Sequence, residues 1–171
     1  MQDDDYPELA RLINDCLKSA LVAVLATGED DGAWATPIYF SYDADLNFYF
    51  MSQANTRHVV DIKKRSRVSL AIFSSPKDVI GFKVGVQVEG MANEVPDQDV
   101  ERVYMNRSMR LTGVDKWNTD SMGGHMIKQE GGIFIKISPI SINYTDRRYF
   151  KEDGIKVSVN KLREAYKGLQ Y

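Results

Sequence analysis

The chain has 171 residues and a net charge of −2, and 43% of its residues are hydrophobic. This length predicts one domain with its own core over residues 1–171, and the slightly acidic balance argues against nucleic acid or an acidic membrane as a partner. A single cysteine, Cys16, excludes a disulfide scaffold and a cysteine-based zinc site, and it favours the reducing cytoplasm. No stretch has the ~20 apolar residues of a membrane span, and residues 1–5 are expected to fray.

The first half of the chain predicts one helix followed by three consecutive strands. Apolar residues recur at helical spacing between residues 7 and 19. The expected strands are 21–27, 33–42 and 46–52. Pro37 cannot donate to a ladder, which places the second strand at a sheet edge or at a bulge. Its neighbouring backbone groups would then be open to a ligand.

The second half of the chain is also rich in strands. Asn55 is expected to cap a short helix that ends in a basic run, and Asp97 to cap another helix. Alternating apolar residues predict strands around 68–72, 84–88, 133–137 and 140–142. Gly90 is expected to mark a bulge, and the glycine-rich residues 108–132 a long loop. This order predicts a mainly β fold that closes as a small barrel.

The segment 52–58, with the sequence SQANTRH, is the clearest candidate for a ligand site. Its last residues would lie in the first turn of a helix, where backbone N–H groups and the helix dipole favour an anion. The hydroxyls of Ser52 and Thr56 can donate to phosphate oxygens, and the guanidinium of Arg57 can bind two of them. The alternative is that Arg57 pairs with Asp61 at i+4 and that the segment is only a solvated polar face.

A resemblance to a known family is carried by six segments, in the order LVAVLATGEDDG, ATPIYF, NFYF, SQANTRHVV, RVSL and GVQVEG. Over about residues 9–110 the chain resembles the pyridoxamine 5′-phosphate oxidase-like family of FMN-binding split barrels. The resemblance implies an antiparallel split β-barrel of six to seven strands with flanking helices. It also implies a homodimer with FMN in each of two clefts between the subunits, and an oxidoreductase that passes hydride through flavin N5 between a reduced nicotinamide and a small substrate.

The resemblance also implies roles for individual residues. The residues expected to line the flavin ring with their backbone are Thr36, Pro37, Ile38, Tyr39 and Phe40. Met51 and Ser52 would reach the ribityl phosphate, and Thr56 and Arg57 would hold it. His58 stands where the family commonly has lysine, so FMN affinity is expected to fall between about pH 6 and 8 as the imidazole loses its proton.

Four residues have two possible roles within this resemblance. Tyr39 would either orient a substrate above the flavin or pack in the barrel. Gln87 would either contact the flavin or face solvent. Trp117 would either contact the flavin of the partner subunit or anchor the long loop by packing. His125, which has methionines nearby, would either ligate haem or lie at the surface.

The C-terminal segment departs from the true pyridoxamine 5′-phosphate oxidases. These enzymes carry a motif similar to EFWQ followed by paired arginines, and residues 140–150 lack it, so oxidation of vitamin B6 is not expected. The chain has no GxGxxG fingerprint, so a nicotinamide nucleotide would bind transiently over the flavin. No metal-ligand spacing is present. The alternatives are a non-catalytic FMN- or haem-binding sensor or stress protein, a deazaflavin in place of FMN, and a barrel without flavin.

Overall fold

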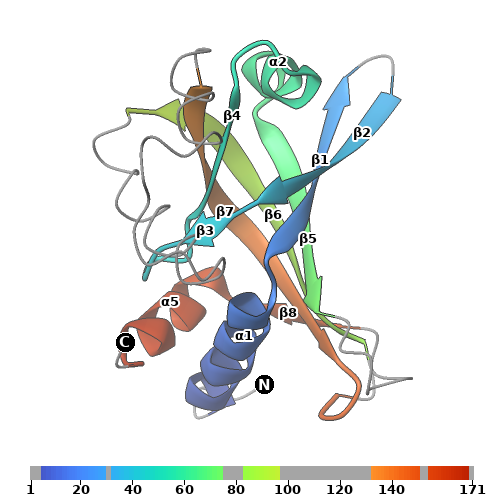
Figure 1. Ribbon diagram of the computed structural model, residues 1–171. Coiled ribbons are helices and arrows are strands. Elements are labelled where there is room, and N and C mark those ends of the chain that lie inside the picture. Colours follow the sequence, from blue (N-terminus) through green and yellow to red (C-terminus); the bar gives the residue numbers. More distant parts are fainter. Residues whose placement is uncertain (1–4, 30–31, 75–82, 97–131, 151–153, 170–171) are drawn as a thin grey trace.

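The fold is built around one antiparallel sheet that curls into a half-open barrel, which confirms the mainly β split barrel expected from the sequence (Figure 1). The computed structural model describes residues 5–29, 32–74, 83–96, 132–150 and 154–169. Among the helices of these residues, none is long and apolar enough to cross a membrane.

The sheet has eight strands. They are β1 (Val22–Glu29), β2 (Gly32–Tyr39), β3 (Ser41–Tyr42), β4 (Phe48–Gln53), β5 (Arg67–Ser74), β6 (Val84–Val95), β7 (Gly132–Asp146) and β8 (Ile155–Val157). Their order in space is β2-β1-β5-β6-β7-β4-β3, and β8 pairs with β7. Among the described strands, β2 is therefore one edge of the sheet, which is the first of the two positions, edge or bulge, expected from Pro37.

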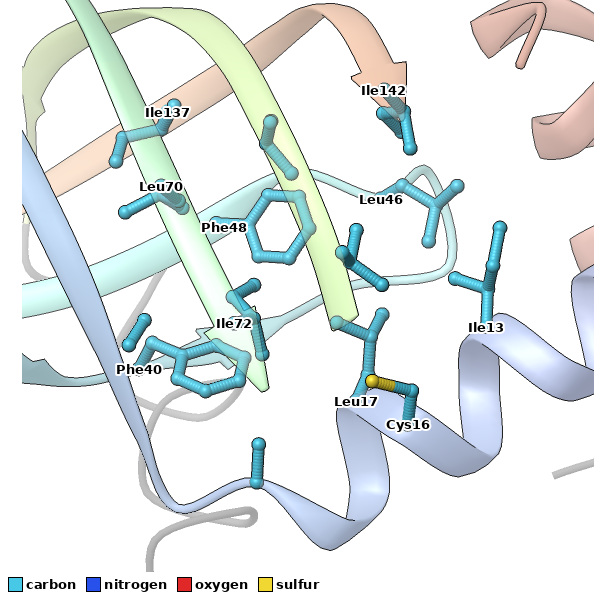
Figure 2. Packing of buried hydrophobic residues seen from close by; sticks show 14 of the residues in the cluster. Ile13, Cys16, Leu17, Phe40, Leu46, Phe48, Leu70, Ile72, Ile137 and Ile142 are labelled. Atoms are coloured by element: carbon cyan, nitrogen blue, oxygen red, sulfur yellow. The ribbon is translucent and has the colours of Figure 1, made fainter. Parts of the chain in front are cut away.

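The strand register sorts the side chains onto two faces of the sheet. Leu25 of β1 lies opposite Leu70 of β5, and both side chains are buried. Phe40 and Phe48 fill the same core from the other side of the barrel (Figure 2). Residues that alternate with these, such as Val24, point to the outer face. The core therefore lies inside the curl of the sheet.

The meander differs from the expected strands at its second turn. The expected strand 33–42 is interrupted at Phe40, because β2 pairs with β1 whereas β3 pairs with β4. The expected strand 46–52 begins later, at Phe48. The carboxylate of Asp43 accepts hydrogen bonds from the backbone N–H and the side-chain amide of Asn47, at 2.8 and 2.9 Å. These bonds hold the residues between Asp43 and Asn47 in a turn, which is why β4 begins only at Phe48.

β7 corrects the expectation of two separate strands at 133–137 and 140–142. It is one strand of 15 residues, which pairs with both β4 and β6. The register shifts between Glu89 and Gly90, and Ile140 is left without a partner, which confirms the expected bulge. A Cβ at Gly90 would lie 2.7 Å from the carbonyl oxygen of Ser138. The strand therefore continues past Pro139, which pairs with Gly90 beside the bulge.

Helices α1 (Tyr6–Ser19) and α5 (Val159–Lys167) lie side by side at one end of the barrel (Figure 1). The expected helix 7–19 is confirmed, and Ile13 and Leu17 bury its apolar face in the core (Figure 2). The sequence pattern did not predict α5. The Tyr166 hydroxyl of α5 donates to Asn14 Oδ1 of α1 at 2.5 Å, between two buried side chains. These two helices cover one end of the barrel.

Candidate functional site

Helix α2 (Arg57–Lys64) lies at the end of the barrel opposite α1 and α5 (Figure 1). The backbone N–H and the hydroxyl of Thr56 both donate to the carbonyl of Gln53, at 3.2 and 2.9 Å. Thr56 is the N-cap residue, because its carbonyl accepts the first backbone bonds of the helix, from Val59 N–H and Val60 N–H at 3.1 and 3.0 Å. The expectation that Asn55 caps the helix is wrong, since Asn55 lies exposed in the preceding turn. Arg57 and His58 occupy the first turn of the helix, which contains no acidic residue.

Three polar atoms meet where β4 leads into α2. Ser52 Oγ lies 2.8 Å from His58 Nε2 and 3.1 Å from Thr56 Oγ1. Thr56 Oγ1 lies 3.2 Å from the same His58 nitrogen. The structure thus brings together three of the residues that the sequence assigns to a phosphate site.

His58 is buried, and its ring lies 5.9 Å from the ring of Phe50. Burial lowers the pKa of His58 below the ordinary value of 6.5, and the negative charge of Asp61 raises this pKa by a smaller amount. The imidazole is therefore neutral at pH 7. The titration of this group is therefore centred below 6.5, toward the acidic end of the range of about pH 6 to 8 expected from the sequence.

Arg57 is held from two sides. Its guanidinium carbon lies 4.5 Å from the centre of the Trp34 ring on β2, and its Nε lies 3.9 Å from Asp61 Oδ2. The i+4 pair that the sequence offers as the alternative to a ligand role is therefore present, but its distance exceeds that of a hydrogen bond. The stacking on Trp34 joins α2 to the edge strand and limits the directions in which the guanidinium can bind.

Asp61 fastens α2 to the sheet. Its carboxylate is buried and accepts a hydrogen bond from the Thr27 hydroxyl of β1 at 2.8 Å. Val59 and Ile62 are also buried and form the apolar face of the helix. A buried carboxylate requires such a partner, so this bond fixes the helix on β1.

The candidates for the ring-binding segment lie along β2 and just beyond its end. Ile38 and Phe40 are buried in the core, so only their backbone can meet a ligand. Pro37 and Tyr39 point to the outer face, and Tyr39 is 59% exposed, so it does not pack inside the barrel. Among the described residues, Thr36 Oγ1 is the one buried side-chain polar atom without a hydrogen-bond partner.

Met51 and Gln87, two further candidates for flavin contact, lie on different strands, β4 and β6. Met51 is half-buried on β4, next to Ser52. Gln87 is exposed on the outer face of β6 and accepts a hydrogen bond from Asn143 Nδ2 at 3.0 Å. In the sheet, Gln87 is three strands from Pro37, or roughly 14 Å at the usual strand spacing. Within one chain, Gln87 therefore does not lie beside the residues of β2 that the sequence assigns to the flavin ring.

Several candidates lie outside the described residues. These are Trp117, His125, the helix expected after Asp97 and the loop expected over 108–132, apart from its last residue. In the described parts of the chain, no group of three or more His, Cys, Asp or Glu side chains could hold a metal ion.

Two residues of the site were not found from the sequence. Thr27 and Trp34 lie opposite each other in the β1–β2 hairpin and contact Asp61 and Arg57, respectively. The hairpin turn fixes the strand register and the alternation of side chains fixes the face, so the sequence could have predicted that these two residues are neighbours on one face. Their contacts with α2 depend on the folded barrel, and no local pattern shows those contacts.

The curled antiparallel sheet, with a polar cluster where it stays open, defines a split-barrel protein. A family model described as "Pyridoxamine 5'-phosphate oxidase" matches residues 9–126, more than half of the chain. The chain therefore belongs to the pyridoxamine 5′-phosphate oxidase family, which confirms the resemblance seen in the sequence. No curated protein matches it.

Solved structures share this fold at low sequence identity. A conserved hypothetical protein from Mycobacterium tuberculosis is 22% identical, with a TM-score of 0.64, over 85% of this chain and 89% of that one. A FAD-binding protein from Mesorhizobium loti is 19% identical, with a TM-score of 0.58, over 80% and 92%. A heme binding protein from Mycobacterium smegmatis is 15% identical, with a TM-score of 0.64, over 93% of this chain and 60% of that one. At these identities the likeness shows the fold alone.

The buried imidazole predicts how stability depends on pH. Because folding lowers the pKa of His58, the unfolded chain binds a proton more readily than the folded protein once the pH falls below 6.5. The contribution of this group to the free energy of unfolding is therefore complete above that pH. It is lost as the pH falls through the folded pKa, by at most about 1.4 kcal/mol per pH unit. Urea unfolding of the wild type and of His58→Gln, between about pH 5 and 7.5, should show a shallower decline in the variant. Identical declines would contradict a buried neutral histidine.

Proposed function

We propose that this protein binds FMN, with the phosphate at the first turn of α2 and the flavin ring along the edge of β2. The observation that carries the proposal is the junction of β4 and α2, where the Ser52 hydroxyl and the first turn of α2 with Arg57 converge without an acidic residue in that turn. A helix start, a hydroxyl and a guanidinium each suit a phosphate monoester. Family membership, and a structural neighbour described as FAD-binding, support a flavin as its carrier.

The edge of β2 suits the polar rim of a flavin ring. An edge strand directs part of its backbone N–H and C=O groups away from its one neighbour. Within the described parts of the chain, the buried Thr36 Oγ1 has no hydrogen-bond partner, and a flavin ring at this edge would be able to supply one. Trp34 lies on the same strand and contacts Arg57, so the ring-binding edge adjoins the phosphate site. The residues present therefore fit FMN.

Retained FMN and the effect of Arg57 test this site. The purified protein is expected to keep about one FMN per chain after desalting, visible as flavin absorbance bands. Arg57→Ala removes a charged hydrogen bond to the phosphate and should weaken FMN binding by about 1.5 to 3 kcal/mol, or about 10- to 150-fold in Kd. Arg11→Ala is the matched control, because Arg11 is exposed on α1 beside Glu8, and its Kd should equal that of the wild type. An unchanged Kd in Arg57→Ala would contradict the phosphate assignment.

The same site supports an oxidoreductase that transfers hydride between a reduced nicotinamide and a small substrate. Bound FMN supplies a ring that accepts and returns hydride, so no side chain needs to act as a nucleophile or a general base. The residues of this chain hold the phosphate and the ring edge, and the exposed Tyr39 orients a molecule beside that edge. The reducing cytoplasm suits the buried free thiol of Cys16 and would supply the reduced nicotinamide.

A non-catalytic protein that binds FMN or haem is the second candidate. The C-terminal segment lacks the motif of true pyridoxamine 5′-phosphate oxidases, and a neutral His58 stands where the family commonly has lysine. A heme binding protein shares the fold, which keeps haem among the candidate ligands, and a deazaflavin is a further alternative to FMN.

Nicotinamide turnover separates the two candidate functions. In air-equilibrated buffer, where dissolved oxygen reoxidises the reduced flavin, the FMN-loaded protein is expected to oxidise NADH or NADPH at least ~10-fold faster than the same concentration of free FMN. The reason is that a held ring is oriented for hydride transfer. The loss of nicotinamide absorbance measures this rate. A rate equal to that of free FMN would favour the non-catalytic protein, and a Soret band in place of flavin bands would favour haem.

We propose that the homodimer forms through the outer face of the sheet. This face has a hollow of about 340 Å³, whose lining residues include Val24, Ala26, Ser69, Ala71, Gln87 and Asn143. Val22 and Phe73 are large exposed side chains on the same face. An exposed apolar face of this kind is typical of an interaction site. It adjoins β2, so a second copy would lie beside the flavin.

The dimer predicts a specific effect of charge on this face. Sedimentation velocity of the wild type should show a dimer, and Phe73→Glu should shift it to monomer, because an unpaired carboxylate would be buried in the interface. Tyr149→Glu is the control, since Tyr149 is similarly exposed, at 61% against 54%, but follows β7 in a turn. A wild type that sediments as a monomer would rule out this interface.

A further inference from the structure

We propose that His58 is a positioning residue of the phosphate site, whose Nε2–H holds the Ser52 hydroxyl so that Ser52 donates its own proton to the phosphate. This role rests on the proposed FMN function and deepens it. It explains how a neutral histidine can serve at a position where the family commonly has lysine.

The count of hydrogen-bond donors and acceptors in the cluster requires the proton of the neutral His58 ring to be on Nε2. The Thr56 hydroxyl has one proton, which it donates to the Gln53 carbonyl at 2.9 Å. Its oxygen can then only accept in its 3.2 Å contact with Nε2. A bare Nε2 would face this oxygen lone pair to lone pair, so the contact needs a hydrogen on Nε2.

Ser52 makes the shorter contact with the imidazole. The two hydroxyl oxygens share the one Nε2–H, and Ser52 Oγ at 2.8 Å is the nearer acceptor, ahead of Thr56 Oγ1 at 3.2 Å. Because Ser52 Oγ accepts this hydrogen, the serine proton is left for another acceptor. Within the cluster that acceptor is Thr56 Oγ1, at 3.1 Å. A charged phosphate oxygen is a stronger acceptor than a hydroxyl, so a phosphate would draw the serine proton outward. Of the two hydroxyls, Ser52 serves the phosphate and Thr56 holds the turn.

Burial makes His58 act through Ser52. The residue is 8% exposed, and its ring lies against Phe50. Burial favours the neutral ring, and Asp61, in the next turn of the helix, opposes this only in part. A neutral ring with its proton on Nε2 donates without carrying a positive charge. A lysine would bring a positive charge and hydrogen-bond donors directly to the phosphate. His58 instead orients the Ser52 hydroxyl, which is the group that donates to the phosphate.

The affinities of the full chain for FMN and for riboflavin, which lacks the phosphate, test this role. Quenching of flavin fluorescence gives both Kd values, and their ratio isolates the phosphate contact. His58→Met removes the N–H and should lower the preference for FMN about 5- to 10-fold, as should Ser52→Ala. The double variant should lose no more than Ser52→Ala alone, because one residue acts through the other.

Two further variants separate positioning from structural damage. His58→Gln retains an N–H donor at a similar reach and should restore most of the preference that His58→Met loses. Val59→Ala disturbs a buried neighbour on the same helix, outside the polar cluster, and should leave the FMN-to-riboflavin ratio unchanged. Additive losses in the double variant would overturn the proposal. Equal losses for FMN and riboflavin would also overturn it, since they would show a purely structural role.

The tautomer of His58 supplies a readout that needs no ligand. A long-range ¹H–¹⁵N NMR spectrum of the full chain without flavin should show the neutral Nε2–H form, and the Nδ1–H form would overturn the proton assignment. A wild-type protein with the Nε2–H form that fails to bind FMN would contradict the proposed function. The role toward the phosphate would then fall with it, while the proton assignment would stand.

Discussion

The candidate site depends on one buried carboxylate. Asp61 is 4% exposed and accepts a hydrogen bond from Thr27 across the gap between helix and sheet. An unpartnered carboxylate in this position would be costly, so the bond fixes where α2 lies on β1. Arg57 and His58 are one turn earlier on the same helix. The bond that fastens Asp61 therefore also sets where the guanidinium and the imidazole stand.

The site exists because the sheet does not close. Among the described strands, β2 pairs only with β1, and from Phe50 onward β4 pairs only with β7. α2 follows β4 in the chain and packs on β1 (Figure 1). It therefore connects the open edge at β4 to β1, which is the neighbour of the other open edge, β2. α1 and α5 fill the opposite end with apolar contacts. One end of the barrel thus supplies stability, and the other keeps free edges and polar groups for a ligand.

The local part of the site could be predicted from the sequence, and the long-range part could not. The contacts of His58 with Ser52 and Thr56 span two to six positions, so the turn and the helix start contain most of the information. The cap was misplaced by one residue because adjacent residues that both favour capping are not distinguished by propensity. The bond from Thr27 to Asp61 spans 34 positions and exists only after the hairpin and the helix have met. The continuity of β7 also depends on long-range contacts. Pro139 predicts a break between two strands, but pairing with β4 and β6 keeps them as one strand.

The charge balance of the site limits how it can hold a phosphate. The positive charge of Arg57 is offset by Asp61, and His58 is neutral. A phosphate here would gain its affinity from oriented donors, the helix N–H groups and the Ser52 hydroxyl, more than from net positive charge. A site of this kind depends less on salt than one with an added lysine, and it releases the phosphate more readily. The affinity of such a site for a phosphate would therefore depend on how well the structure orients one hydroxyl and one helix start.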